Sequence, residues 1–180
     1  MPTCHVYIAT SLDGFIARPD GDIEWLHQWP DIGDDYGYAA FMNSVDGLII
    51  GRGTFEKVLS FGTWPYEKPV IVLSRTLDPE AVPADRAGRV RILALSPEEV
   101  LDMLRREGWS RAYVDGGRLI QSFLAAGLID DMTITRVPIL LGAGRPLFGS
   151  LPHDVVLTHF ETNAYPSGFV QSRYAIGRVP

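Results

Sequence analysis

The chain has 180 residues, a formal net charge of −6 at pH 7 and a hydrophobic fraction of 46%. This length and composition suit a globular protein with a substantial buried core, which we expect to form one domain over residues 1–180. The negative charge argues against a broad nucleic-acid or acidic-membrane surface, so neither is expected as a partner. No apolar run approaches the roughly 20 residues that cross a bilayer, so the sequence predicts no transmembrane helix.

The cysteine and histidine residues indicate which cellular compartment to expect and whether a metal site is predicted. Cys4 is the only cysteine, which excludes an internal disulfide and favours a reducing compartment. The first residues also lack the basic-then-apolar layout of a signal peptide, so we expect a cytoplasmic protein. The four histidines show no metal-ligand spacing, and one thiol cannot form a zinc-deaminase signature, so no metal site is predicted.

Hydrophobic periodicity and turn residues predict alternating strands and helices along the chain. Strands are expected over residues 4–9, 47–50, 69–73, 89–94, 111–114, 131–140, 155–162 and 168–176. Helices are expected over residues 35–44, 54–60, 96–108 and 118–126, with Thr54 as an N-cap. This interleaving predicts a mainly parallel sheet with helices on both faces, and the last two strands predict an antiparallel end.

Three of the predicted strands end in a Gly or Ser beside an arginine. They are followed by Gly51-Arg52-Gly53-Thr54, by Ser74-Arg75 and by Gly116-Gly117-Arg118. In an open α/β sheet, ligands lie at the carboxyl ends of the strands. Free backbone N–H groups at helix starts and guanidinium groups suit phosphate oxygens. Three such junctions in one small chain predict a phosphorylated nucleotide.

Several motifs in a fixed order carry a family resemblance over almost the whole chain. They lie at residues 11–17, 51–54, 73–75, 115–118 and 138–148. The order of elements resembles the dihydrofolate reductase fold, an α/β fold with a mixed sheet of about eight strands, mostly parallel with antiparallel C-terminal strands. The amino-acid sequences of the motifs are most similar to those of stand-alone relatives of the reductase domain of the bacterial riboflavin-biosynthesis deaminase–reductase.

This resemblance implies an NADPH-dependent oxidoreductase. It would transfer hydride to a C=N or C=O of a small pterin- or pyrimidine-like substrate, with 5-amino-6-(5-phosphoribosylamino)uracil reductase as the nearest family activity. Dihydrofolate reductase activity, and a non-catalytic protein that binds a nucleotide or a flavin, remain alternatives. The family also implies a homodimer through the apolar segment 137–148 and its neighbouring strands, although that segment could instead pack wholly within one subunit.

The resemblance implies cofactor-binding roles by position. We expect four kinds of contact: backbone contacts to the nicotinamide, a first phosphate-binding turn, a turn around the 2′-phosphate and a pyrophosphate turn. The residues expected to make them are Ala9, Ile16, Gly51, Arg52, Thr54, Leu73, Ser74, Arg75, Asp115, Gly116, Gly117, Arg118 and Leu119. Two arginines beside a hydroxyl favour NADPH over NADH, because NADH offers no 2′-phosphate. Loop 11–25 is long, contains glycine and is placed to act as a lid.

The proton donor and the substrate pocket leave alternatives open. Asp35 matches the carboxylate on a helix of dihydrofolate reductases, but it could equally be a helix N-terminal acid. Asp115 stands where those enzymes have a glycine, either near the cofactor edge or as a turn residue. Asp13 is expected to be structural. Trp25 and Tyr36 are the aromatic residues expected to line a substrate pocket, although core packing is the alternative for both.

Overall fold

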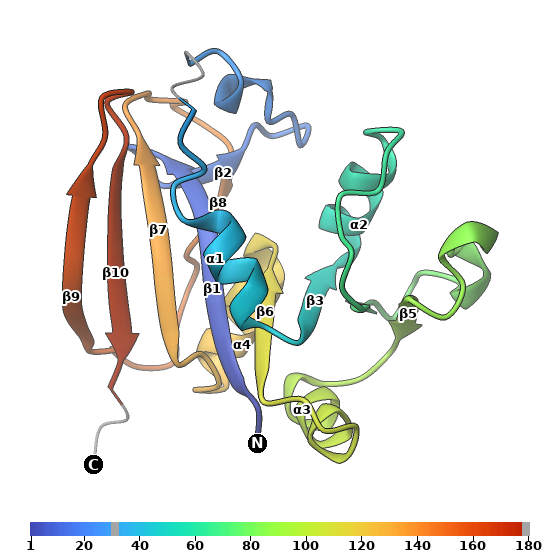
Figure 1. The fold of residues 1–180 in the computed structure, drawn as a ribbon. Helices are drawn as coiled ribbons and strands as arrows, with labels where there is room; N and C mark the ends of the chain where they lie inside the picture. The colour runs from blue at the N-terminus through green and yellow to red at the C-terminus, as the bar shows by residue number, and fades with distance from the viewer. Residues whose placement is uncertain (30–32, 178–180) are drawn as a thin grey trace.

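The structure is a computed structural model that describes residues 1–29 and 33–177. Within these residues an eight-stranded sheet has the order β5-β4-β3-β6-β1-β7-β10-β9 (Figure 1). Its strands are β1 (Thr3–Ser11), β3 (Gly47–Gly51), β4 (Val70–Leu73), β5 (Val90–Leu93), β6 (Arg111–Asp115), β7 (Asp131–Val137), β9 (Leu157–Ala164) and β10 (Val170–Ile176). A two-stranded sheet joins β2 (Phe15–Ala17) to β8 (Arg145–Pro146).

The strand directions confirm the expected mixed sheet. Neighbouring strands from β5 to β7 are parallel, whereas β10 is antiparallel to β7 and β9 is antiparallel to β10. The central strand β3 is buried on both faces over Leu48, Ile49 and Ile50, as its continuous apolar run requires for a parallel strand covered by helices. The carboxyl ends of the parallel strands therefore share one edge of the sheet.

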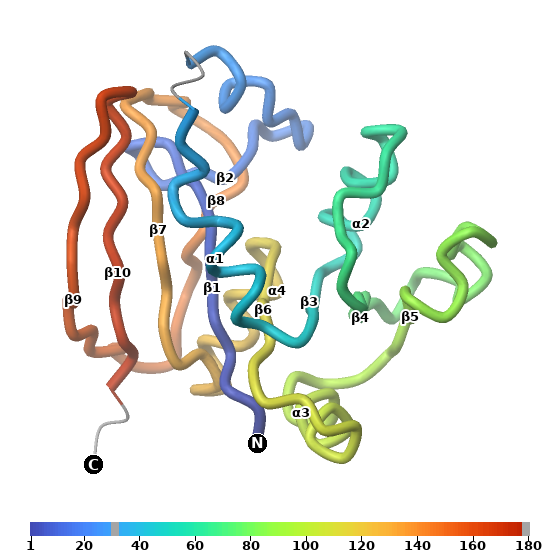
Figure 2. The backbone as a smooth tube through the Cα atoms, in the orientation of Figure 1, coloured from blue at the N-terminus to red at the C-terminus, as the bar shows by residue number. Residues whose placement is uncertain are grey.

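Four α-helices of the described chain cover the two faces, as Figures 1 and 2 show. They are α1 (Tyr38–Ser44), α2 (Arg52–Leu59), α3 (Pro97–Arg106) and α4 (Gly117–Ala125). Side chains of α3 and α4 pack in one core cluster, and side chains of α1 and α2 pack in the cluster on the other face. Short 3-10 helices η1 (Glu24–Leu26), η2 (Pro79–Ala81) and η3 (Ala84–Arg86) lie in the connections.

Helix ends show where local sequence decided the fold. The predicted capping box of α3 is confirmed, because the Ser96 hydroxyl accepts from Glu99 N at 3.2 Å and the Glu99 carboxylate accepts from Ser96 N at 2.8 Å. The prediction that Thr54 is the N-cap of α2 is wrong. The N-cap is Gly51, three residues earlier, and Thr54 lies inside the first turn.

Two element boundaries differ from the predicted ones, and one strand pair was not predicted, each for an identifiable reason. Strand β7 ends at Val137 rather than at residue 140, since Pro138 has no N–H to continue the ladder. Helix α1 begins at Tyr38 because Tyr36 and Gly37 have φ of 57° and 86°, outside the helical region. The strand pair β2 and β8 was not predicted, because runs of three and two residues carry too little periodicity.

The segment 18–29, which follows β2, passes over the carboxyl edge of the sheet. Figure 2 shows it rising above β2 and β8, beside the end of β7. Trp25 is buried and anchors this segment in a cluster with Val137 and Phe169. No helix in the described part of the chain is long and apolar enough to cross a bilayer.

Candidate active site

The carboxyl ends of β3, β4 and β6 bring together the three junctions singled out in the sequence. Gly51 at the end of β3 pairs in register with Leu73 of β4. On its other side, Ile50 pairs with Asp115 of β6. The two helices that start directly after β3 and β6 are α2 and α4, so both helix N-termini lie at this edge.

We call Gly51, Thr54, Gly116 and Gly117 the glycine cradle, because the two turns touch where a side chain would not fit. A Cβ at Gly116 would lie 2.7 Å from Thr54 Oγ1, and the φ of Gly116 is 106°. A Cβ at Gly117 would lie 2.9 Å from Ile16 Cδ1. Gly116 is therefore favoured both by its φ and by the contact with Thr54, whereas a side chain at Gly117 would require the Ile16 side chain to move. Helices α2 and α4 both begin here, and the free backbone N–H groups of helix starts suit an anion.

An arginine and a hydroxyl cluster border the cradle on the β4 side. Arg52 Nη1 donates to Thr76 Oγ1 at 3.1 Å, and Arg52 Nε donates to Glu56 at 2.7 Å. The Ser74 hydroxyl accepts from the backbone N–H of Thr76 at 3.2 Å and holds this turn in shape. Arg75 is exposed beside them. Thr76 was not predicted, although its hydroxyl directly after Ser74-Arg75 was a usable signal.

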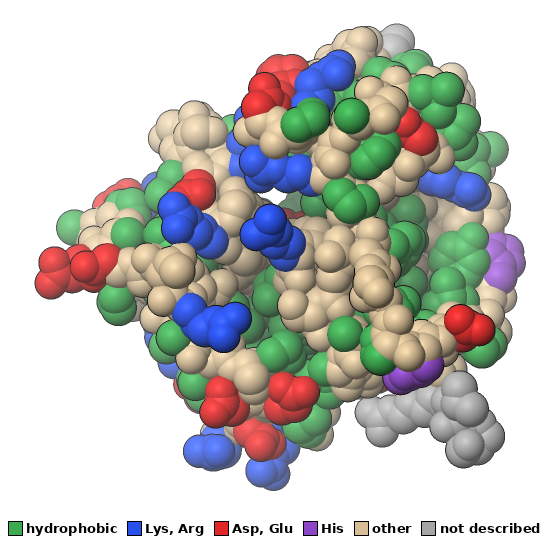
Figure 3. Space-filling view, turned by 180° about the vertical axis from the view of Figure 1, so that it is seen from behind, with side chains coloured by type: hydrophobic (Ala, Val, Ile, Leu, Met, Phe, Trp, Pro, Cys, Tyr) green, Lys and Arg blue, Asp and Glu red, His purple; other side chains and the backbone are tan. Residues whose placement is uncertain are grey.

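The remaining predicted cofactor residues lie at different distances from the cradle. Leu119 Cβ would lie 3.7 Å from a Cβ at Gly51, so the first turn of α4 packs against the end of β3. Arg118 is exposed in the same turn. Ala9 lies farther off, on β1, paired with Thr135 of β7. Seen from behind, Lys and Arg side chains gather around a central hollow of the molecule (Figure 3).

Loop 11–25 is fastened to the loop that follows β7. The Asp13 carboxylate accepts from the backbone N–H groups of Leu141 at 3.1 Å and Gly142 at 2.8 Å, and from the Ser11 hydroxyl at 2.6 Å. The Ser11 bond and the two backbone bonds lower the pKa of Asp13. These contacts support the structural role predicted for Asp13.

Asp115 is the half-buried carboxyl group of the site. It ends β6, and burial raises its pKa to about 6, although hydrogen bonds from Gly116 and Tyr113 act in the opposite direction. Its charge in turn raises the pKa values of Tyr38 and Tyr66, after the larger effect of burial on each. Tyr38 belongs to α1 and Tyr66 follows α2. Asp115 therefore lies close enough to Tyr38 and Tyr66 to affect both, and it directly precedes Gly116 of the glycine cradle.

Asp35 has a different environment. Its carboxylate accepts from Ala39 N and Gly37 N, both at 2.9 Å, and these bonds lower its pKa. The side chain is exposed. Of the two interpretations left open by the sequence, these contacts match the acid that caps a helix start.

Trp25 and Tyr36, the two predicted substrate-pocket residues, lie in the aromatic cluster above the sheet. The Trp25 side chain is 1% exposed. The Tyr36 ring stacks on Phe169, with centroids 5.2 Å apart, and contacts Tyr165 edge-on at 4.8 Å. The Tyr36 carbonyl accepts from the Tyr7 hydroxyl and from Gln171 Nε2. These contacts match the core-packing interpretation for both side chains.

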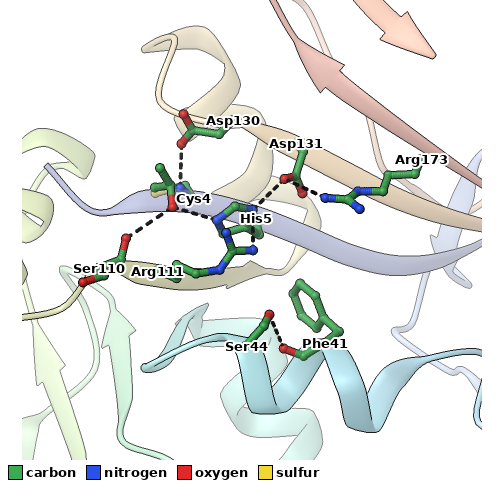
Figure 4. Close-up of polar contacts among 10 residues, drawn as sticks. Cys4, His5, Phe41, Ser44, Ser110, Arg111, Asp130, Asp131 and Arg173 are labelled. Carbon is green, nitrogen blue, oxygen red and sulfur yellow. Dashed lines mark hydrogen bonds and ion pairs between the residues drawn. The ribbon is translucent and has the colours of Figure 1, made fainter. Parts of the chain in front are cut away.

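A second polar cluster lies at the opposite edge, where the parallel strands begin (Figure 4). His5 Nδ1 lies 2.9 Å from Asp131 Oδ2, and Arg173 Nη2 lies 3.6 Å from the same oxygen. Burial acts to raise the pKa of Asp131, but the hydrogen bond and charge of His5 and the charge of Arg173 lower it overall. These contacts join β1, β7 and β10. No group of three or more potential metal ligands occurs among the described residues.

Comparison with known proteins identifies relatives over nearly the whole chain. The family model of the RibD C-terminal domain matches residues 2–170. The uncharacterised protein YwjB of Bacillus subtilis (strain 168) is 35% identical over 155 residues, which cover 84% of this chain and 86% of YwjB.

Solved structures agree with this match. A protein of Shewanella sp. PV-4 named for riboflavin biosynthesis is 42% identical, with a TM-score of 0.92 over 98% of this chain and 99% of that one. The Thermotoga maritima diaminohydroxyphosphoribosylaminopyrimidine deaminase/5-amino-6-(5-phosphoribosylamino)uracil reductase has a TM-score of 0.74. It is 17% identical and aligns over 98% of this chain and 57% of its own length, so it shows the fold alone.

Proposed function

The chain belongs to the RibD C-terminal domain family, and from this premise we propose that it is an NADPH-dependent reductase. Its substrate would be a small pyrimidine- or pterin-like heterocycle with a reducible C=N or C=O, and 5-amino-6-(5-phosphoribosylamino)uracil is the nearest family substrate. One observation supports this proposal above the others. A cradle of two helix N-termini suited to phosphate lies directly beside Asp115, a carboxyl group whose pKa is raised to about 6.

The cradle and its arginines would hold the cofactor. Gly116 and Gly117 leave the backbone open to the pyrophosphate, where the N-terminus of α4 favours negative charge. The 2′-phosphate would lie between Arg52 and the Ser74-Arg75 turn, which the bond from Arg52 to Thr76 already brings together. Guanidinium groups bind phosphate bidentately, so this side selects NADPH over NADH.

Asp115 would supply the proton. Bound NADPH supplies the hydride to the carbon of the C=N or C=O bond. The neighbouring nitrogen or oxygen then takes up a proton, which a carboxyl group with a pKa of about 6 can donate near neutral pH. The segment above β2 and β8 would exclude water from the reacting atoms. A non-catalytic nucleotide- or flavin-binding protein lacks any need for such a proton donor, so the placement of Asp115 favours the enzyme.

The test uses Asp115→Asn with Asp35→Asn as the matched carboxylate control. NADPH consumption is followed with a panel of aminopyrimidine, pterin and dihydrofolate substrates, and NADPH binding is titrated separately. Asp115→Asn should lower turnover about 10²- to 10⁴-fold with NADPH affinity kept, whereas Asp35→Asn should retain turnover. Equal turnover of Asp115→Asn and wild type would reject Asp115 as the donor. A yellow purified protein that does not bind NADPH would favour the flavin-binding alternative.

We further propose that the protein forms a homodimer through an apolar groove of about 250 Å³ beside β7, β9 and β10. Leu12, Phe148 and Leu157 line this groove and are 58%, 45% and 40% exposed. Large apolar side chains exposed together mark an interaction surface. A second copy would cover them and shield the open edge strand β9. Sedimentation that shows only monomer at micromolar concentration would reject this assembly.

A further inference from the structure

Arg145 is an exposed cation whose terminal nitrogens have no partner among the described residues. It begins β8 and pairs with Ala17 of β2. Its Nε donates to the Pro19 carbonyl at 3.4 Å. Its two terminal nitrogens have neither a carboxylate nor a hydrogen-bond acceptor among the residues that the structure describes. The carboxylate next to Gly21 in the chain, Asp22, pairs with Arg18 at 3.5 Å, and Glu56, in the helix that contains Gly53, pairs with Arg52 at 2.7 Å.

The guanidinium group lies against loop 11–25. A Cβ at Gly21 would lie 3.0 Å from Arg145 Nη2 and 3.2 Å from Nη1. Gly21 also has a φ of 91°, which strongly favours glycine. The absence of a side chain at Gly21 is therefore what leaves room for the guanidinium group. Through this contact and the bond to Pro19, the Arg145 side chain packs against the segment 19–21.

The same guanidinium group points at the phosphate side of the site. A Cβ at Gly53, in the first turn of α2, would lie 3.7 Å from Arg145 Nη1. The carbonyl of the next residue, Pro146, would lie 3.0 Å from a Cβ at Gly117, where α4 begins. The short strand β8 therefore touches both helix starts of the glycine cradle. The guanidinium group of Arg145 therefore lies beside the first turn of α2, and the Pro146 carbonyl lies beside the start of α4.

We propose that Arg145 binds the pyrophosphate of the cofactor and thereby couples cofactor binding to the position of loop 18–22. This inference rests on the proposed function, because it requires a pyrophosphate-containing cofactor in the cradle. A guanidinium group has five N–H donors and can bind phosphate through its terminal nitrogens while Nε keeps its bond to Pro19. The pyrophosphate is common to NADPH and NADH. Arg145 therefore serves both cofactors, in contrast to the 2′-phosphate role proposed for Arg75.

The binding test compares Arg145→Ala with Arg89→Ala, which removes the same charge from an exposed position just before β5, at the other edge of the sheet. Each protein is titrated with NADPH, with NADH and with adenosine 2′-monophosphate, which has the 2′-phosphate but no pyrophosphate. Arg145→Ala should weaken NADPH and NADH binding equally, by about 10- to 100-fold, and leave adenosine 2′-monophosphate binding unchanged. Arg89→Ala should match wild type throughout.

The outcomes separate this inference from the proposed function. Wild-type protein that binds neither cofactor overturns both. Wild type that binds NADPH while Arg145→Ala binds it equally well overturns only the role of Arg145. A loss confined to NADPH would place Arg145 at the 2′-phosphate instead and would also overturn it.

Amide hydrogen exchange tests the coupling to the loop. Saturating NADPH should slow exchange over residues 18–23 in wild type and in Arg89→Ala but not in Arg145→Ala. Equal protection in all three proteins at saturation would overturn the coupling. Far-UV circular dichroism confirms that each variant is folded.

Discussion

Asp115 makes the stability of this protein depend on pH in a way that Asp115→Asn should remove. Burial raises its pKa from the ordinary 3.8 to about 6. The carboxyl group therefore stabilises the folded state fully below pH 3.8, and this contribution is lost as pH rises through 6. The two pKa values correspond to a total of about 3 kcal/mol, and somewhat less than half of this falls between pH 5 and pH 8. Asparagine resembles the protonated form and does not ionise.

Urea unfolding of cofactor-free protein at pH 5 and pH 8 measures this effect. The free energy of unfolding of Asp115→Asn, relative to wild type, should rise by roughly 1 kcal/mol from pH 5 to pH 8. Asp35→Asn is the control. The pKa of the Asp35 carboxyl group is lowered, so this group is ionised at both pH values. The free energy of unfolding of Asp35→Asn relative to wild type should therefore stay constant. A constant or falling difference for Asp115→Asn would refute the assignment of a desolvated carboxyl group at the end of β6.

Four further changes probe other parts of the molecule. Gly116→Ala should weaken NADPH and NADH binding alike in a titration, because its Cβ would lie 2.7 Å from Thr54 Oγ1; unchanged affinity would contradict the close-packed cradle. Arg75→Ala should weaken NADPH binding about 10- to 100-fold and spare NADH, and equal losses would reject the 2′-phosphate role. Asp131→Asn should lower the free energy of unfolding at pH 7. Because the folded-state pKa of Asp131 is lowered, this deficit should disappear as urea midpoints are followed below about pH 4. Leu157→Asp should shift a dimer to monomer in sedimentation, and a retained dimer would exclude the groove as the interface.

The sequence predicted the elements whose local chemistry is decisive. Continuous apolar runs predicted the buried parallel strands, and the box formed by Ser96 and Glu99 predicted the start of α3. Glycines and arginines after the strands predicted that the junctions at Gly51 and Gly116 would meet, because parallel strands place their carboxyl ends at one edge. These predictions depend on neighbours in the chain and on one general property of parallel sheets.

Contacts between distant segments decided the rest. Asp35 and Asp115 are both acids beside predicted elements. Burial in the folded protein raises the pKa of Asp115, whereas the pKa of Asp35 is lowered. The pairing of β2 with β8 joins segments about 130 residues apart through two and three residues, too few for a periodic signal. Arg145 gains its place over Gly21 and Gly53 from that pairing. Desolvation and close approach arise only when the chain has folded. The tertiary structure therefore determines the raised pKa of Asp115 and the contacts of Arg145.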